Sequence, residues 1–173
     1  MKFPKLPLKI QKPSLESKKT YYKTPLGTAE IIGNEQGIQS VSVLDQDIET
    51  SASIPAFAKD CVLQMEEYFA GDRTEFDLKL NLQGTDFQKS VWRELLNIPY
   101  GKTRTYLEQT KKIGDPKAIR AVASANGKNP IWIIVPCHRV IGSDGSLTGY
   151  AGGIWRKKWL LEHESPVKQQ SLF

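Results

Sequence analysis

Cysteine and histidine are scarce in this chain, which has two of each among its 173 residues. Two cysteines cannot build the disulfide framework of a small secreted domain, so we expect the protein to work in a reducing compartment. Two histidines and no Cys-x-x-Cys pair argue against a structural zinc site. We therefore expect no bound metal.

Long hydrophobic runs are also missing. No stretch approaches the roughly 20 apolar residues of a membrane-spanning helix. Residues 1–17 mix lysine with proline and lack the uninterrupted apolar core of a signal peptide. We expect no membrane partner. The net charge of +5 permits an anionic partner such as nucleic acid, although charge alone does not select one.

The first half of the chain predicts a small α/β domain. Residues 1–19 form a Lys/Pro-rich tail, and the domain is expected over residues 20–82. Short β-like runs separated by turn signals predict an antiparallel sheet. Pro55 then opens a helix that Gly71 should stop. This helix holds Cys61, which we interpret as a packed and inert thiol. Residues 76–82 alternate apolar and polar side chains, as a final strand or a linker would.

The second half, residues 83–165, is expected to be mainly helical and to be followed by a tail over residues 166–173. Thr85 should cap a helix from Phe87 to Asn97 with Phe87 in its apolar stripe. Two more helices joined by a tight turn at residues 113–115 predict a helix-turn-helix. The predicted fold class is therefore α/β in the broad sense, more strictly α+β: an antiparallel-sheet domain and then a helical one.

The densest reactive chemistry lies in residues 133–141, which read Ile-Ile-Val-Pro-Cys-His-Arg-Val-Ile. We expect a buried Val/Ile-rich strand that displays Cys137 at its end. A thiol attacks as the thiolate, and its ordinary pKa of about 8.5 calls for a nearby base or positive field. His138 is adjacent but should point the other way on an extended segment, so we expect a water relay between them. A carboxylate in residues 159–164 would orient the imidazole.

Two further segments admit two interpretations each. The helix expected over residues 117–126 has a face of small side chains beside Arg120, which suits either close packing in the core or approach to a nucleic-acid groove. The loop over residues 142–153 is rich in glycine, which permits close approach of the backbone to a ligand. Tyr150 in that loop would stack on a planar group, unless the loop is only a flexible surface segment.

Taken together, these residues resemble the O6-alkylguanine-DNA alkyltransferases, also called methylated-DNA–protein-cysteine methyltransferases. The segment Pro136–Val140, Pro-Cys-His-Arg-Val, is similar to the active-site signature of that family. The resemblance covers about residues 20–164, and its motifs follow one another in the family's order. The matching segments are residues 24–27, 85–92, 98–106, 120–122, 125–130, 148–153 and 158–164.

The resemblance implies DNA repair by direct, irreversible and stoichiometric transfer of the alkyl group from O6-alkylguanine, and from O4-alkylthymine, in double-stranded DNA. The protein would approach DNA through the minor groove, flip the damaged base and need no cofactor. Cys137 would accept the alkyl group, His138 would take the thiol proton through a water, and Glu164 would orient His138. We expect a monomer in the cytoplasm, nucleoid-associated in a bacterium, or in the nucleus of a eukaryote.

The resemblance also implies roles for residues outside the signature. Tyr106 would push the nucleotide out of the stack and help to protonate the leaving guanine, Arg120 would fill the gap in the duplex, and Asn129 would hold the turn that sets Cys137. The other positions expected to contact DNA or the base are Ala121, Ala125, Val140, Tyr150 and Ala151. Some relatives bind zinc in the N-terminal domain, but this chain lacks the ligands. Some relatives have serine at position 151, so here only the backbone N–H would serve the substrate.

The last five residues, Gln169–Phe173, resemble the short peptide by which bacterial repair proteins dock on the replication sliding clamp. In this interpretation Leu172 and Phe173 would enter an apolar pocket of the clamp. The alternative is an end of the chain without a partner.

Three other functions fit the sequence less well than alkyl transfer. The first is a non-catalytic lesion-binding protein of the same fold, but in such relatives the cysteine is replaced. The second is a cysteine hydrolase built on Cys137, His138 and Glu164, which would leave Arg120 and the small-residue face unexplained. The third is a sequence-specific helix-turn-helix regulator, for which alanine is a poor reader of base edges.

Overall fold

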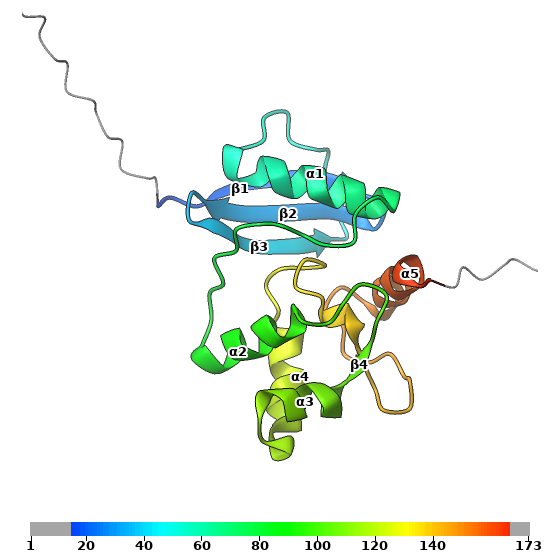
Figure 1. The fold of residues 1–173 in the computed structure, drawn as a ribbon. Coiled ribbons are helices and arrows are strands. Elements are labelled where there is room, and N and C mark those ends of the chain that lie inside the picture. Colours follow the sequence, from blue (N-terminus) through cyan, green and yellow to red (C-terminus); the bar gives the residue numbers. More distant parts are fainter. Residues whose placement is uncertain (1–14, 167–173) are drawn as a thin grey trace, which may run out of the picture.

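The computed structural model describes residues 15–166 and shows a sheet with one covering helix above a helical part (Figure 1). Strands β1 (Lys18–Thr24), β2 (Gly27–Asn34) and β3 (Gly37–Leu44) form an antiparallel sheet in the order β1-β2-β3. Helix α1 (Ala56–Ala70) packs on this sheet. The predicted antiparallel sheet followed by a helical part is confirmed, so the fold is α+β.

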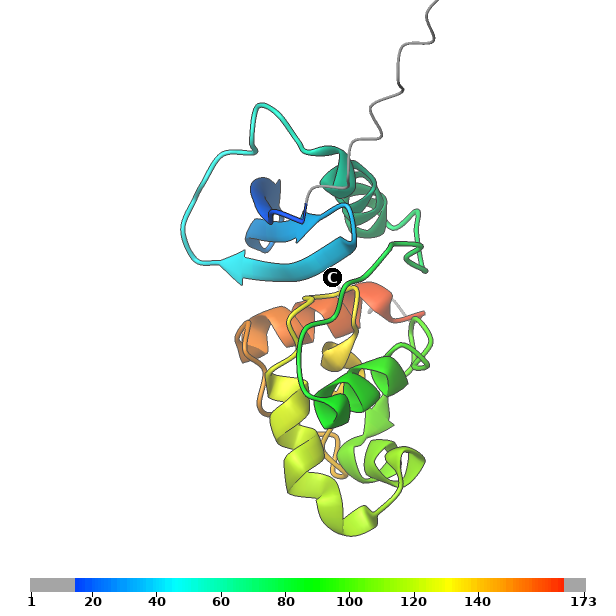
Figure 2. The same ribbon diagram turned by 90° about the vertical axis from the view of Figure 1, so that its left-hand side faces the viewer.

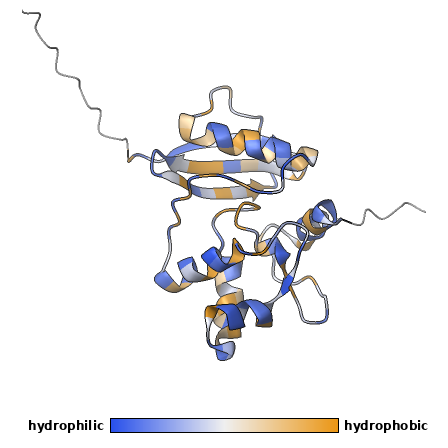
Figure 3. Ribbon diagram, in the orientation of Figure 1, coloured by the Kyte–Doolittle hydropathy of each residue, from blue (hydrophilic) through white to orange (hydrophobic). Residues whose placement is uncertain are grey.

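Alternating side chains explain why these residues form a half-buried sheet with one covering helix. Thr20, Tyr22 and Thr24 of β1 are buried while residues between them are more exposed. Hydrophobic and hydrophilic positions are interspersed along β2, β3 and α1 (Figure 3). The helix ends at Gly71, whose φ of 83° lets its N–H bond back to the carbonyls of the last turn.

The helical part contains the predicted helix-turn-helix at the end of the molecule away from the sheet (Figure 2). Two capping boxes start its first helices, from Thr85 and from Thr105. Its elements are α2 (Asp86–Leu95), β4 (Arg104–Thr105), α3 (Tyr106–Ile113), the 3₁₀ helix η1 (Pro116–Ala118), α4 (Ile119–Gly127), the 3₁₀ helix η2 (Cys137–Arg139), β5 (Val140–Ile141) and α5 (Ile154–Glu164). Strands β4 and β5 pair in parallel.

The prediction of a strand before Cys137 is wrong. Residues 131–135 fold into consecutive turns, with the Val135 N–H bonded to the Ile131 carbonyl at 3.1 Å and a positive φ of 65° at Ile133. All five side chains are buried because the turns pass between the sheet and the helices. A short apolar run buried on every side has the same composition as a buried strand, so periodicity does not distinguish the two.

Two smaller expectations are corrected. Helix α2 ends at Leu95 rather than Asn97, and Phe87, placed in its apolar stripe, is 39% exposed because it lies in the first turn at the edge of the core. Residues 76–82, expected to be either a final strand or a linker, have features of both. They form an extended linker that makes one β-bridge, between Leu80 and Ile38 of β3.

The sheet and the helical part are joined along β3. The Val41 N–H bonds to the Pro130 carbonyl and the Trp132 N–H to the Val41 carbonyl, both at 2.9 Å, so the turns before Cys137 pair with the edge of the sheet. Arg156 of α5 adds bonds of 2.8 Å to the Leu26 carbonyl and to the Asp45 carboxylate. The buried side chains of both parts form one hydrophobic cluster. Within residues 15–166, no helix combines the length and apolarity needed to cross a membrane.

Candidate active site

A cavity of about 160 Å³ opens beside Cys137. It is smaller than the roughly 300 Å³ at which pockets for drug-sized ligands begin, so it suits a single planar ring system with a small substituent. The strand β3, the start of α3, the end of α4 and the loop after residue 148 all contribute to its walls. The lining residues are Val41, Ser42, Val43, Tyr106, Asn126, Gly127, Asn129, Trp132, Cys137, Gly149, Tyr150, Ala151 and Gly152.

Asn129 holds the turn that presents Cys137, as its resemblance-based role requires. Its Oδ1 accepts the Ile131 N–H at 2.9 Å, and its Nδ2 donates to the Val135 carbonyl at 2.7 Å. The same Nδ2 lies 3.2 Å from the Cys137 Sγ. One side-chain amide therefore fixes both ends of the turn and reaches the sulfur.

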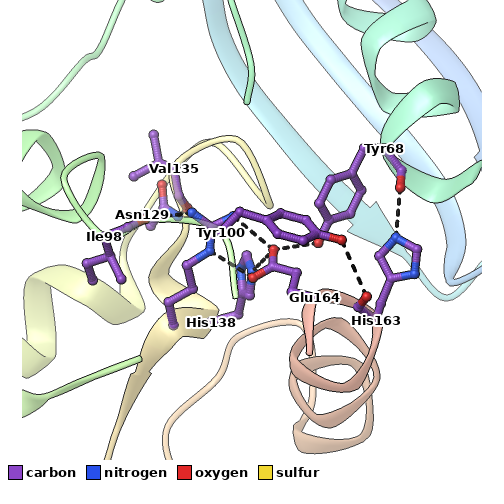
Figure 4. Close-up of polar contacts among 9 residues, drawn as sticks. Tyr68, Ile98, Tyr100, Asn129, Val135, His138, His163 and Glu164 are labelled. Carbon is purple, nitrogen blue, oxygen red and sulfur yellow. Dashed lines mark hydrogen bonds and ion pairs between the residues drawn. The ribbon is translucent and has the colours of Figure 1, made fainter. Parts of the chain in front are cut away.

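His138, the residue after Cys137, forms a buried pair with Glu164 (Figure 4). The His138 Nε2 lies 2.7 Å from the Glu164 Oε1. An ionised carboxylate only accepts, so this bond assigns the imidazole proton to Nε2 and leaves a lone pair on Nδ1. That Nδ1 atom is buried and has no hydrogen-bond partner among residues 15–166. His138 is therefore arranged as a base.

The charge state of the pair follows from its surroundings. Burial alone would raise the pKa of Glu164, but hydrogen bonds from His138 and Arg139 outweigh it and hold that pKa well below the usual range. Arg139 donates to both carboxylate oxygens, at 2.8 and 2.9 Å. Burial lowers the pKa of His138, with the positive charges of Arg139 and Lys157 acting in the same direction and Glu164 opposing them. The imidazole is therefore neutral at pH 7.

The two cysteines differ in their access to a substrate. Burial raises the pKa of the Cys61 thiol to about 12, and this thiol lies inside α1, 3.9 Å from the sulfur of Met65. Burial also raises the pKa of Cys137, but the Asn129 hydrogen bond and the positive charge of Lys157 oppose that shift. Cys137 alone of the two lines the cavity.

Lys157 is a buried ammonium beside this site, only 1% exposed. Its Nζ donates to the Thr148 carbonyl at 3.2 Å and lies 5.8 Å from the centroid of the Tyr106 ring. Burial lowers the pKa of Lys157, whereas the charge of Cys137 raises it. The lysine thus supplies the positive field that the thiolate needs.

Two phenols face the same cavity as proton donors. Tyr106, at the start of α3, donates to the Thr148 carbonyl at 3.1 Å, and burial followed by the charge of Cys137 raises its pKa. Burial, again followed by the charge of Cys137, raises the pKa of Tyr150 well above its usual value, although the Trp132 indole opposes this. Both hydroxyls therefore stay protonated at neutral pH.

Not every residue expected at the site is found there. Val140 is fully buried and pairs with Arg104 in the β4–β5 ladder, outside the cavity lining. Ala125 does not share the exposed face of α4, because it is buried and its carbonyl accepts a 2.8 Å bond from the Trp92 indole. Arg120 and Ala121 are exposed on α4, away from the cavity.

Several site residues were missed from the sequence. Arg139 belongs to the signature but was given no role, and its position beside His138 was the available signal. Lys157 stands between two other basic residues and Tyr68 beside an aromatic residue of α1, so neither carried a signal of its own. The Trp132 side chain and the β3 wall, Val41–Val43, carried no local signal.

The site offers a thiol, an imidazole, two phenols and an ammonium. Across the described part of the chain, no three His, Cys, Asp or Glu side chains are grouped so as to hold a metal ion. The His138 Nε2 is bonded to Glu164, and the His163 Nε2 lies 2.7 Å from the Tyr68 carbonyl.

Comparison with known proteins identifies the family of both halves. The ribonuclease-like domain of 6-O-methylguanine DNA methyltransferase matches residues 17–82, and the DNA-binding domain of the same family matches residues 86–166. A methylated-DNA–protein-cysteine methyltransferase of Mycobacterium tuberculosis is 50% identical over 151 residues, 83% of this chain and 92% of the relative. One from Methanosarcina barkeri is 50% identical over 149 residues, 82% of this chain and 93% of the relative.

Solved structures agree. The crystal structure of Mycobacterium tuberculosis O6-methylguanine methyltransferase is 48% identical, with a TM-score of 0.77 over 86% of this chain and 93% of that one. The structure of Mycobacterium tuberculosis OGT in complex with DNA is 49% identical, with a TM-score of 0.77 over 84% of this chain and 92% of that one. The chain belongs to the 6-O-methylguanine DNA methyltransferase family.

Proposed function

We propose that this protein repairs alkylated DNA directly, as a methylated-DNA–protein-cysteine methyltransferase that moves the alkyl group from O6-alkylguanine, and from O4-alkylthymine, to Cys137. The observation that carries the proposal is the thiol of Cys137 on a cavity of base-ring size, backed by a neutral imidazole whose Nδ1 has no partner within residues 15–166. Relatives of this chain bear the same activity in their names.

In the proposed reaction the His138 Nδ1 takes the thiol proton through a water, and Glu164 stabilises the imidazolium that forms. The Cys137 Sγ attacks the alkyl carbon, an S–C bond forms, and the bond from that carbon to O6 breaks with its electron pair left on the base. Tyr106 delivers a proton to the departing guanine, and the proton taken up by His138 returns through solvent to Tyr106. The net exchange is an alkyl group for a proton, and the thioether product has no good leaving group. Each molecule therefore reacts once.

The DNA-facing side of the proposal rests on α4. A base inside a duplex cannot reach the cavity, so it must be flipped, at a few kcal/mol. Arg120 is exposed on α4 and would occupy the gap, while the small side chain of Ala121 would let the helix backbone approach the minor groove. Exposed lysines of the helix-turn-helix would hold the phosphates without reading sequence; they are Lys111, Lys112, Lys117 and Lys128.

The experiment is a repair assay with the full chain and a duplex that contains O6-methylguanine. We expect the lesion to be converted to guanine until one methyl group per protein molecule has been transferred, and then to stop. Continued turnover would point to the cysteine hydrolase instead. Binding to the lesion duplex without any loss of the lesion would point to the lesion-binding protein.

We further propose that the protein acts as a monomer, because one chain supplies every group of the site. We also propose that it works in the cytoplasm, since Cys61 and Cys137 are both free thiols and a reducing compartment keeps them so. Residues Gln169–Phe173, proposed to dock on a sliding clamp, lie outside the described residues. Deletion of these five residues should abolish capture by the clamp in a pull-down and leave alkyl transfer unchanged. Clamp capture by the shortened chain would end this part of the proposal.

A further inference from the structure

The catalytic carboxylate receives a hydrogen bond from the sheet domain. Tyr68, near the end of α1, donates its hydroxyl to the Glu164 Oε1 at 2.7 Å. The two residues are 96 positions apart in the sequence. Figure 4 shows Tyr68 and His138 converging on Glu164 from different elements.

The oxygen that binds His138 is the one that Tyr68 reaches. The Glu164 Oε1 takes the His138 Nε2 at 2.7 Å and the Arg139 Nη2 at 2.9 Å, in addition to the Tyr68 hydroxyl. The other oxygen, Oε2, takes the Arg139 Nε at 2.8 Å. Three donors from α1 and η2 thus fix the direction in which Oε1 faces the imidazole.

We propose that Tyr68 is a positioning residue for alkyl transfer, whose hydroxyl sets the orientation and charge of the Glu164 carboxylate that His138 relies on. The inference builds on the function proposed above. It assigns a part in the chemistry to the N-terminal domain, which otherwise contributes only the β3 wall of the cavity.

Packing of α1 against α5 does not need this hydroxyl. The Tyr68 ring makes an edge contact with His163, at 5.1 Å between centroids, and with Tyr100, at 6.2 Å. The Tyr68 backbone carbonyl separately accepts the His163 Nε2 at 2.7 Å. Phenylalanine at position 68 would keep the ring and the carbonyl bond and remove only the bond to Glu164.

The effect on charge has a definite sign. A neutral donor on Oε1 draws electron density away from the bond to His138, so its removal strengthens the attraction of Glu164 for an imidazolium. The pKa of His138 should then rise from its lowered value. The other charged or titratable groups around the pair are Arg139 on η2, Lys157 on α5, Cys137 and Tyr100, and they are unchanged in the variant.

The test compares Tyr68→Phe with Tyr100→Phe, a matched change in a neighbouring ring whose hydroxyl points instead to the His163 carbonyl, at 3.4 Å. Single-turnover methyl transfer is measured over a pH series with protein in excess of lesion duplex. For Tyr68→Phe we expect the saturating rate to fall about three- to tenfold, the scale of one lost hydrogen bond. The acid limb of its pH profile should also move up by about half a unit. Tyr100→Phe should change neither quantity.

A second readout does not depend on activity. The chain has two histidines, so imidazole ¹⁵N NMR of the labelled protein gives two sets of signals. We expect the His138 titration to shift upward in Tyr68→Phe and to stay in place in Tyr100→Phe. Unchanged rates and an unchanged His138 titration in Tyr68→Phe would overturn the proposal, as would equal losses in both variants. Absence of transfer by the unsubstituted protein would instead refute the proposed function.

Discussion

The two halves of the molecule carry opposite charge. Residues 20–82 contain four Lys/Arg against eleven Asp/Glu, a net charge of −7, whereas residues 83–166 contain thirteen against seven, a net charge of +6. Residues 1–19 and 167–173 together add +6, so the total is +5. This modest total conceals the contrast between the acidic half and the basic half, which holds the helix-turn-helix away from the sheet (Figure 1). Phosphates attract one half and repel the other, so the charge orients the protein on DNA as well as drawing it there.

The acidic half nevertheless contributes to the site. It supplies the β3 wall of the cavity and, from α1, the Tyr68 hydroxyl on Glu164. Arg156 links the acidic half to the glycine-rich loop over residues 142–153, because its guanidinium donates to both the Leu26 carbonyl and the Gly152 carbonyl at 2.8 Å. The two halves therefore have different roles: the basic half holds DNA, and the acidic half shapes and supports the reaction centre.

The largest effect is expected where the two halves meet, at Glu164. Glu164→Gln leaves Arg139 buried without its carboxylate, and breaking a buried ion pair in this way costs about 3–5 kcal/mol. The pKa of Glu164 is depressed in the folded state, so its stabilisation is complete above the ordinary carboxyl pKa of about 4.3 and is lost as the pH falls below it. Denaturant unfolding between about pH 5 and pH 2 should therefore show a weaker loss of stability with acid for the variant than for the unsubstituted protein.

The control for this measurement lies on the same helix. Glu162 is exposed and faces Lys158 at 3.9 Å, so Glu162→Gln should change the free energy of unfolding by less than about 1 kcal/mol. Similar losses in the two variants would mean that the buried cluster does not stabilise the junction.

An intermediate effect is expected for Arg120→Ala on the basic half. Loss of the side chain proposed to fill the duplex should slow repair in double-stranded DNA by about tenfold, since flipping costs a few kcal/mol. Repair of the same lesion in a single strand should change much less, because that strand has no pair to open. The matched change on the acidic half is Arg73→Ala, which should leave the ratio of duplex to single-strand rates unaltered. An equal loss on both substrates would rule out a flipping role for Arg120.

The smallest effect is expected in the salt dependence of DNA binding, which should differ between lysine variants of the two halves. Lys117 is exposed in η1 of the basic half and Lys59 is exposed in α1 of the acidic half. Lys117→Gln should reduce the slope of log affinity against log salt by about 0.9, one phosphate contact, and Lys59→Gln should not change it. Fluorescence anisotropy with an undamaged duplex at several salt concentrations measures both slopes. Identical slopes for the two variants would mean that DNA does not contact the basic half at Lys117.

Features set by neighbouring residues could be predicted from the sequence. The cap at Thr85 and the stop at Gly71 depend on local hydrogen bonds, and the structure has both. The carboxylate sought in residues 159–164 is Glu164, which meets His138 from the end of α5. These patterns work because the residues involved are close in sequence or confined to one short segment.

Features set by distant segments could not be predicted. The Ile/Val run before Cys137, residues 133–135, is expected to be a strand but forms turns, because burial on all sides hides the period that distinguishes the two. Lys157 lies between two other basic residues in the sequence, yet the loop carrying Thr148 buries it. The Tyr68 bond joins two helices from opposite halves, and no spacing rule relates them.

The central claim is that Cys137, and not Cys61, accepts the alkyl group and is consumed. The direct measurement is intact-protein and peptide mass spectrometry after incubation with excess O6-methylguanine duplex, beside a Cys137→Ala variant. We predict one added methyl group per molecule, located on the peptide that contains Cys137, and none on the variant. Cys61, whose pKa is raised to about 12, should stay unmodified. A methyl group on Cys61, or loss of the lesion without any gain in protein mass, would contradict this claim.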